Sequence, residues 1–109
     1  MTQPDHDFVA AADAVMRDLF TRLCEFDPDE VDCDLAMGVL TMQFADGKKF
    51  VLNRQSAASQ IWLAHGVSAY HFARDPQTGR WLDTKGRGEL RELLARAIGE
   101  KLGRPVSLP

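Results

Sequence analysis

Residues 31–55, VDCDLAMGVLTMQFADGKKFVLNRQ, decide the fold class, because apolar and polar side chains alternate along this stretch. At its start the apolar positions are separated by Asp32 and Asp34. Alternation with a period of two is typical of a strand that buries one face and leaves the other in water. The same alternation continues over residues 39–44. The dipeptide Asp46-Gly47 follows, and it predicts a two-residue hairpin turn into the next strand.

Further short stretches of the same kind extend the sheet. We expect strands at residues 48–53, 60–64, 69–72 and 80–83. The turn-rich residues 75–79, DPQTG, separate the last two of these strands. Short strands joined by tight turns predict an antiparallel sheet of five or six strands.

Two amphipathic helices flank the predicted sheet. Apolar side chains recur at helical spacing over residues 8–26 and again over residues 89–102. Asp27-Pro28 ends the first helix, because the residue before a proline avoids helical backbone angles. The sequence therefore predicts an α+β fold with one domain over residues 1–109. It is a two-layer α-β sandwich, with the N- and C-terminal helices on one face of the sheet. We expect the tail after Gly103 to add little stability, although Val106 and Leu108 are placed to cover the groove between the helices.

Composition narrows the class of protein. The charged fraction is 27%, which is ordinary for a globular protein, and no apolar run approaches the roughly 18 residues of a membrane span. The N-terminus lacks the basic and apolar blocks of a secretory signal, so we expect a cytoplasmic protein. Cys24 and Cys33 are too few for a disulfide framework and lack zinc-site spacing, so we expect both to be reduced thiols.

Negative charge is concentrated near the N-terminus. Residues 1–34 hold ten acids and two bases, whereas residues 35–109 hold six acids and eleven bases. Six of the ten residues in the acidic segment, residues 25–34, are Asp or Glu. Neighbouring carboxylates repel each other, and oxygen-preferring cations or a basic protein partner relieve that repulsion. The alternative is a solvated acidic face that serves solubility. Either binding hypothesis requires that the chain's own arginines and lysines leave these acids uncompensated.

Trp62 is the second candidate feature, because the strand pattern directs it out of the sheet among polar neighbours. Exposed tryptophan is enriched at protein interfaces. A tryptophan half-covered by adjacent side chains is the alternative. Nucleic-acid binding is disfavoured, because phosphate requires a basic surface and this end of the chain is acidic.

Residues 53–72, NRQSAASQIWLAHGVSAYHF, carry a resemblance to a known family. This stretch resembles the signature of the frataxin family in its short bacterial form, at the positions Asn53, Arg54, Gln55, Gln60, Trp62, Leu63, Ala64, Tyr70, His71 and Phe72. Residues 31–34 and 38–41 are similar to the first two strands of that family. The resemblance covers nearly the whole chain, from Phe8 to Ser107.

The resemblance implies weak surface binding of ferrous and ferric iron, for which other divalent or trivalent cations can substitute. The implied ligands form what we call the acidic ridge, namely Asp7, Asp18, Glu25, Asp27, Asp29, Glu30, Asp32 and Asp34. It further implies docking on a cysteine desulfurase and an iron–sulfur scaffold protein through Asp32, Asp34, Asn53, Gln60 and Trp62. Phe20, Thr21 and Cys24 stand where relatives often carry acids, so the resemblance does not fix the exact ligands.

The resemblance thus implies an iron-dependent regulator or iron donor of iron–sulfur cluster assembly. The alternative is a regulator that acts purely through protein contacts and binds metal incidentally. We expect no enzymatic activity, because no Glu-x-x-His pair that would build an iron-oxidation centre is present. We also expect a monomer in the absence of excess metal, with neither nucleic acid nor membrane as a partner.

Overall fold

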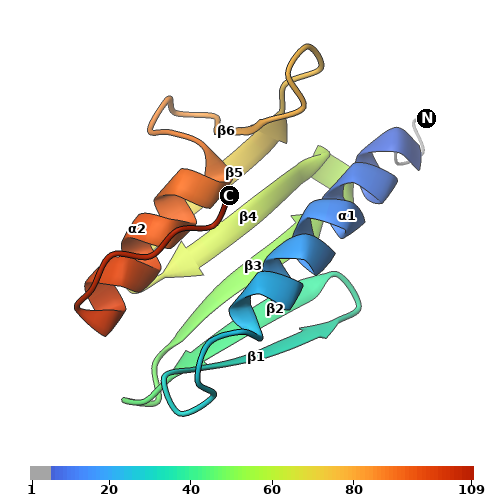
Figure 1. The fold of residues 1–109 in the computed structure, drawn as a ribbon. Helices are drawn as coiled ribbons and strands as arrows, with labels where there is room; N and C mark the ends of the chain where they lie inside the picture. The colour runs from blue at the N-terminus through green and yellow to red at the C-terminus, as the bar shows by residue number, and fades with distance from the viewer. Residues whose placement is uncertain (1–5) are drawn as a thin grey trace.

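The computed structural model describes residues 6–109, in which two helices cover one face of a six-stranded antiparallel sheet (Figure 1). The elements are α1 (His6–Leu23), β1 (Val31–Ala36), β2 (Val39–Phe44), β3 (Lys49–Gln55), the 3-10 turn η1 (Ser56–Ala58), β4 (Gln60–His65), β5 (Ser68–Arg74), β6 (Trp81–Asp83) and α2 (Leu90–Leu102). The predicted two-layer α-β sandwich is confirmed. Within residues 6–109, neither helix has the length and apolar character that a bilayer crossing requires.

The strands follow one another across the sheet in chain order, from β1 at one edge to β6 at the other. The core lies between the sheet and the helices. Its fully buried large side chains are Met16, Leu19, Leu23, Leu40, Met42, Leu52, Ile61, Leu63, Phe72, Leu90, Leu94 and Ile98. The other face of the sheet is open, because no helix or strand of residues 6–109 covers it (Figure 1). The alternating sequence pattern therefore assigned the two faces correctly.

The hairpin turns differ in detail from the prediction. Phe44 and Lys48 are joined by the hydrogen bond from Phe44 N to Lys48 O, so the turn has three residues rather than two. Gly47 takes a φ of 82°, the left-handed conformation that closes such a turn with a bulge. The two-residue turn lies instead between β1 and β2. There Met37 and Gly38 have φ values of 53° and 77°, the positive angles of a type I′ turn.

Helix α2 has a defined start and end. The Glu89 carboxylate accepts hydrogen bonds from the backbone N–H groups of Arg91 and Glu92, which caps the N-terminus. Gly103 ends the helix with a φ of 74°. The chain then runs back along α2, and Leu108 is only 4% exposed (Figure 1). Leu108 thus belongs to the core, and the tail contributes more to packing than the sequence suggested.

Candidate functional site

The acidic ridge does not form one continuous surface. Asp7 lies in the first turn of α1, and the rise of a helix places it roughly 24 Å from the last turn, where the acidic segment begins. Asp18 is directed toward α2, since its carboxylate contacts Arg91 of that helix. Asp32 and Asp34 lie on the open face of the sheet. The eight predicted ligands are therefore distributed over several parts of the fold.

The edge strand β1 presents two carboxylates to solvent. Asp32 and Asp34 are exposed and alternate with the inward-facing residues of the strand. They pair across the ladder with Gln43 and Thr41 of β2. Residues two apart on a strand share one face, with backbones about 7 Å apart. The two side chains can therefore bind the same cation or the same basic group of a partner.

The turn before β1 holds the other exposed acids of the segment. The Asp27 carboxylate accepts a hydrogen bond of 2.9 Å from the backbone N–H of Asp29. The backbone oxygen of Asp27 accepts from the N–H groups of Glu30 and Val31, at 2.8 and 3.0 Å. These bonds fix the turn and direct Glu25, Asp27 and Asp29 into water, where all three are exposed.

Two acids of the ridge are compensated by arginines. Asp18 lies 2.7 Å from Arg91 and 3.1 Å from Arg22, and hydrogen bonds from these two guanidinium groups lower its pKa. Arg104 binds both carboxylate oxygens of Glu30, at 2.5 and 2.9 Å, and its hydrogen bonds lower the pKa of Glu30. Both acids are therefore ionised and already engaged.

Five carboxylates of the ridge are free of such partners. Within residues 6–109, no Lys or Arg forms an ion pair with Glu25, Asp27, Asp29, Asp32 or Asp34. Most carboxylates of the acidic segment are thus uncompensated by the chain's own arginines and lysines, as both binding hypotheses require. The sequence pattern located this segment but did not reveal which acids are paired.

The donor set suits a hard cation on an open surface. Carboxylate oxygens are the ligands that iron and magnesium accept readily. Among residues 6–109, however, no three His, Cys, Asp or Glu side chains converge into a closed metal site. Cys33 adds no ligand at neutral pH, because burial, with smaller effects of Cys24 and Asp32, raises its pKa to about 12. The residues fit a hydrated ion held by few carboxylates.

The open face of the sheet carries Trp62 at its centre. The indole N–H donates a 2.8 Å hydrogen bond to Oε1 of Gln60, the residue two positions earlier on the same face. The His71 ring stacks on the indole with centroids 4.2 Å apart and an interplanar angle of 12°. Asn53 is the cross-strand partner of Trp62 on β3. Trp62 is thus half-buried and held flat, with one ring face against His71.

The structure therefore brings Asn53, Gln60 and Trp62 together on the open face of the sheet. It adds His71, which the sequence analysis named only as a position of the family signature. Arg91 and Arg104 were missed as partners of the ridge. No short-range sequence pattern predicts these two contacts, because Arg104 is 74 positions away from Glu30.

Comparison with known proteins finds sequences that are similar to this chain over nearly its whole length. The family model of the frataxin-like domain matches residues 1–104. The iron-sulfur cluster assembly protein CyaY of Thioalkalivibrio sulfidiphilus is 38% identical over 105 residues, covering 95% of this chain and 98% of its own length. The protein of the same name from Ralstonia nicotianae is 35% identical over 108 residues, covering 95% and 93%.

Solved structures agree with this assignment. The frataxin from Psychromonas ingrahamii superposes with a TM-score of 0.85 at 26% identity, covering 98% of this chain and 99% of its own. Trimeric frataxin from Saccharomyces cerevisiae, complexed with ferrous iron, has a TM-score of 0.68 at 24% identity, covering 95% and 92%. At 24% identity, the similarity to the yeast structure is evidence for a shared fold alone.

Proposed function

The chain belongs to the frataxin family, and from this premise we propose that it is an iron-binding protein of iron–sulfur cluster assembly. It docks on the cysteine desulfurase–scaffold complex and acts there as an iron-dependent regulator or iron donor. The names of its relatives support a role in cluster assembly. The single observation that carries the finer proposal is the acidic segment, whose exposed carboxylates form no ion pair with a Lys or Arg within residues 6–109.

Iron binds weakly and at the surface in this proposal. The ligands are carboxylate oxygens of the acidic segment, with Asp32 and Asp34 on one face of β1 and the exposed acids of the preceding turn nearby. Water completes the coordination, because the protein offers no closed set of three ligands within residues 6–109. A yeast frataxin with the same fold is complexed with ferrous iron, which supports iron binding itself. Other divalent or trivalent cations compete for the same oxygens.

Docking uses the acidic segment and the open sheet face together. Asp32 and Asp34 attract a basic patch on the desulfurase, and complementary charge mainly accelerates association and fixes orientation. Trp62 supplies an aromatic anchor that is already ordered by Gln60 and His71, so little side-chain entropy is lost on binding. Metal and partner share Asp32 and Asp34, so the binding of one changes the affinity for the other.

The test is binding of the purified chain to a cysteine desulfurase, measured by calorimetry with and without ferrous iron under anaerobic conditions. We expect iron to change the affinity of the unmodified protein. Asp32→Lys and Trp62→Ala should each weaken binding at least tenfold. Glu100→Lys is the matched control, since it makes the same charge change on the exposed surface of α2 and should alter binding less than twofold. Equal affinity for all four proteins would contradict the proposal.

A second candidate function is a regulator that acts through protein contacts alone. The lack of three converging ligands within residues 6–109 favours it. In that case iron leaves desulfurase affinity unchanged, while Asp32→Lys and Trp62→Ala still weaken binding at least tenfold. We propose no catalytic role, a cytoplasmic location and a monomer when metal is not in excess. Oxygen consumption above that of free ferrous iron in the same buffer would overturn the proposal that the protein has no catalytic role.

A further inference from the structure

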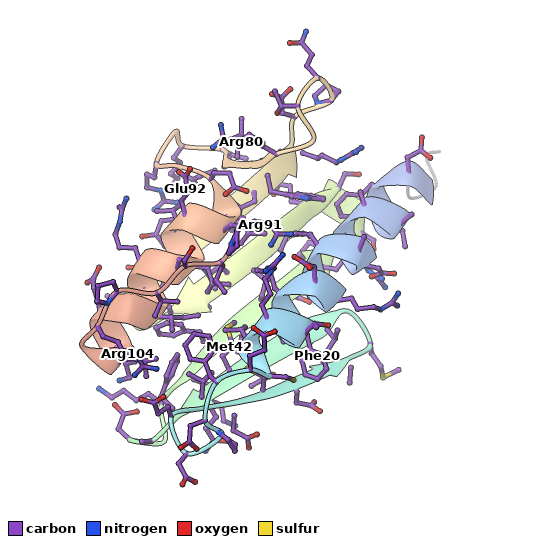
Figure 2. All side chains as sticks on the ribbon, viewed as in Figure 1. Phe20, Met42, Arg80, Arg91, Glu92 and Arg104 are labelled. Atoms are coloured by element: carbon purple, nitrogen blue, oxygen red, sulfur yellow. The ribbon has the colours of Figure 1, made fainter. Side chains whose placement is uncertain are left out.

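Arginines from the C-terminal part of the chain engage two carboxylates of the acidic ridge. Arg104 follows the end of α2, and Arg91 lies in the first turn of that helix (Figure 2). Arg104 binds both carboxylate oxygens of Glu30, and Arg91 binds Asp18. A two-point contact between guanidinium and carboxylate is directional and occupies both oxygens. These contacts divide the ridge into acids that are engaged and acids that are free.

Arg104 is held in place by the backbone around it. Its N–H donates a 3.1 Å hydrogen bond to Gly99 O, and a Cβ at Gly99 would lie 2.9 Å from the Arg104 backbone oxygen. Only glycine permits so close an approach of the chain to the helix. The guanidinium also lies 5.9 Å from the centre of the Phe26 ring. Arg104 is thus positioned for Glu30 before any ligand arrives.

Asp18 is held in a similar way between the helices. It accepts from Arg91 at 2.7 Å and from Arg22 at 3.1 Å, and Arg91 also donates to Pro109 O at 3.0 Å. The Arg91 side chain is only 25% exposed, so its charge is partly withdrawn from water. A cation that binds Asp18 must therefore displace two arginines.

We propose that Arg104 and Arg91 act as internal counter-ions that exclude Glu30 and Asp18 from cation binding and so determine which carboxylates of the ridge take the metal. This inference rests on the proposed iron binding and deepens it. The binding set then consists of the free acids Glu25, Asp27, Asp29, Asp32 and Asp34. Arg104 is a specificity-determining residue, because its removal adds a sixth carboxylate next to the existing five.

The expected effect is modest because the Arg104–Glu30 pair is partly exposed. Its side chains are 46% and 38% exposed, and exposed pairs of this kind shift equilibria by roughly two- to fivefold. Arg104→Gln should therefore raise cation affinity by a factor in this range. Arg96→Gln is the matched control. It removes the same charge from an exposed residue of α2 and should leave the affinity nearly unchanged.

The direct readout is the side-chain carboxyl 13C signal of each acid during titration with Mg²⁺, a diamagnetic cation with the same preference for oxygen. In the unmodified protein and in Arg96→Gln, the signals of Asp32 and Asp34 should move while that of Glu30 stays fixed. In Arg104→Gln the Glu30 signal should move with them. Calorimetry with ferrous iron then measures the gain in affinity.

The outcomes separate this inference from the proposed function. A Glu30 signal that moves equally in all three proteins, or that stays fixed in Arg104→Gln while Asp32 responds, overturns the role of Arg104 and leaves iron binding intact. If no carboxyl signal responds in any of the proteins and calorimetry detects no iron binding, the proposed function and this inference both fail. Circular dichroism checks that each variant is folded, which is expected for substitutions of exposed arginines.

Discussion

Asp83 provides the sharpest prediction about stability. Its side chain, on β6, is fully buried, and its carboxylate accepts from Arg87 Nε at 2.7 Å, Arg87 Nη2 at 3.0 Å and the Arg87 backbone N–H at 3.0 Å. Arg87 in turn lies 4.1 Å from the centre of the Tyr70 ring and donates to Ala69 O. The pair therefore ties the loop before α2 to β5.

The pKa of Asp83 gives the size of the effect. Hydrogen bonds from Arg87 lower it from 3.8 to about 2, against an opposing effect of burial. At about 1.4 kcal/mol for each pH unit, a difference of this size corresponds to about 2 kcal/mol of stability. Because the folded-state pKa is the lower one, this contribution is complete above about pH 4. It is lost as the pH falls toward about 2.

Asp83→Asn keeps the shape of the side chain and removes its charge. We expect the free energy of unfolding at pH 7 to fall by about 2 kcal/mol. We also expect its decrease between pH 4 and pH 2 to become shallower than in the unmodified protein. Urea denaturation followed by circular dichroism at a series of pH values measures both quantities.

Glu92→Gln is the control for this experiment. Glu92 forms an exposed pair with Arg80 at 3.4 Å, so its replacement should cost less than about 0.5 kcal/mol. An unchanged slope between pH 4 and pH 2 in Asp83→Asn would refute the reasoning. So would a loss at pH 7 no larger than that of the control.

Two further predictions concern packing and turn geometry. Leu108→Ala should destabilise the fold by about 2–3 kcal/mol, because Leu108 is only 4% exposed. Thermal unfolding measures this loss of stability. A loss smaller than that of Leu82→Ala, at a partly exposed leucine, would contradict a core role for Leu108. Met37→Asn should raise the stability by about 0.5–1 kcal/mol, because Met37 is 98% exposed and has a φ of 53° that asparagine adopts more readily. An unchanged or lower melting temperature would count against strain at that turn.

The sequence predicted the layers and the orientation of the strands because these depend on local periodicity. Asp32 and Asp34 alternate with buried and partly buried neighbours, and that alternation alone directs them to the open face. Turn geometry was less predictable. Asp46-Gly47 is a strong hairpin signal, but the hydrogen bond from Phe44 N to Lys48 O lengthens the loop by one residue.

The candidate site was predictable only in part, since composition shows where acids are but not what lies beside them. Asp18 and Glu30 look like their neighbours in the sequence, yet each is paired with an arginine more than 70 positions further along. Such contacts depend on how α2 and the tail pack, which no short-range pattern encodes. The long-range ion pairs of the ridge, Asp18–Arg91 and Glu30–Arg104, therefore required the three-dimensional structure, whereas Asp18–Arg22 is a local pair four residues apart.

The order of the strands bears on how the chain folds as it is synthesised. Each strand pairs with the one just made, so the sheet can assemble progressively from β1 to β6. Helix α1 contacts β1 and β3, and its Phe8 ring lies 5.8 Å from the Trp81 ring of β6; α2, which emerges after all six strands, also contacts β6. Until residues 90–108 leave the ribosome, the apolar surface of the sheet that packs with Leu90, Leu94 and Ile98 of α2 lacks that cover. A nascent chain at that stage is a substrate for chaperones that bind exposed apolar surface.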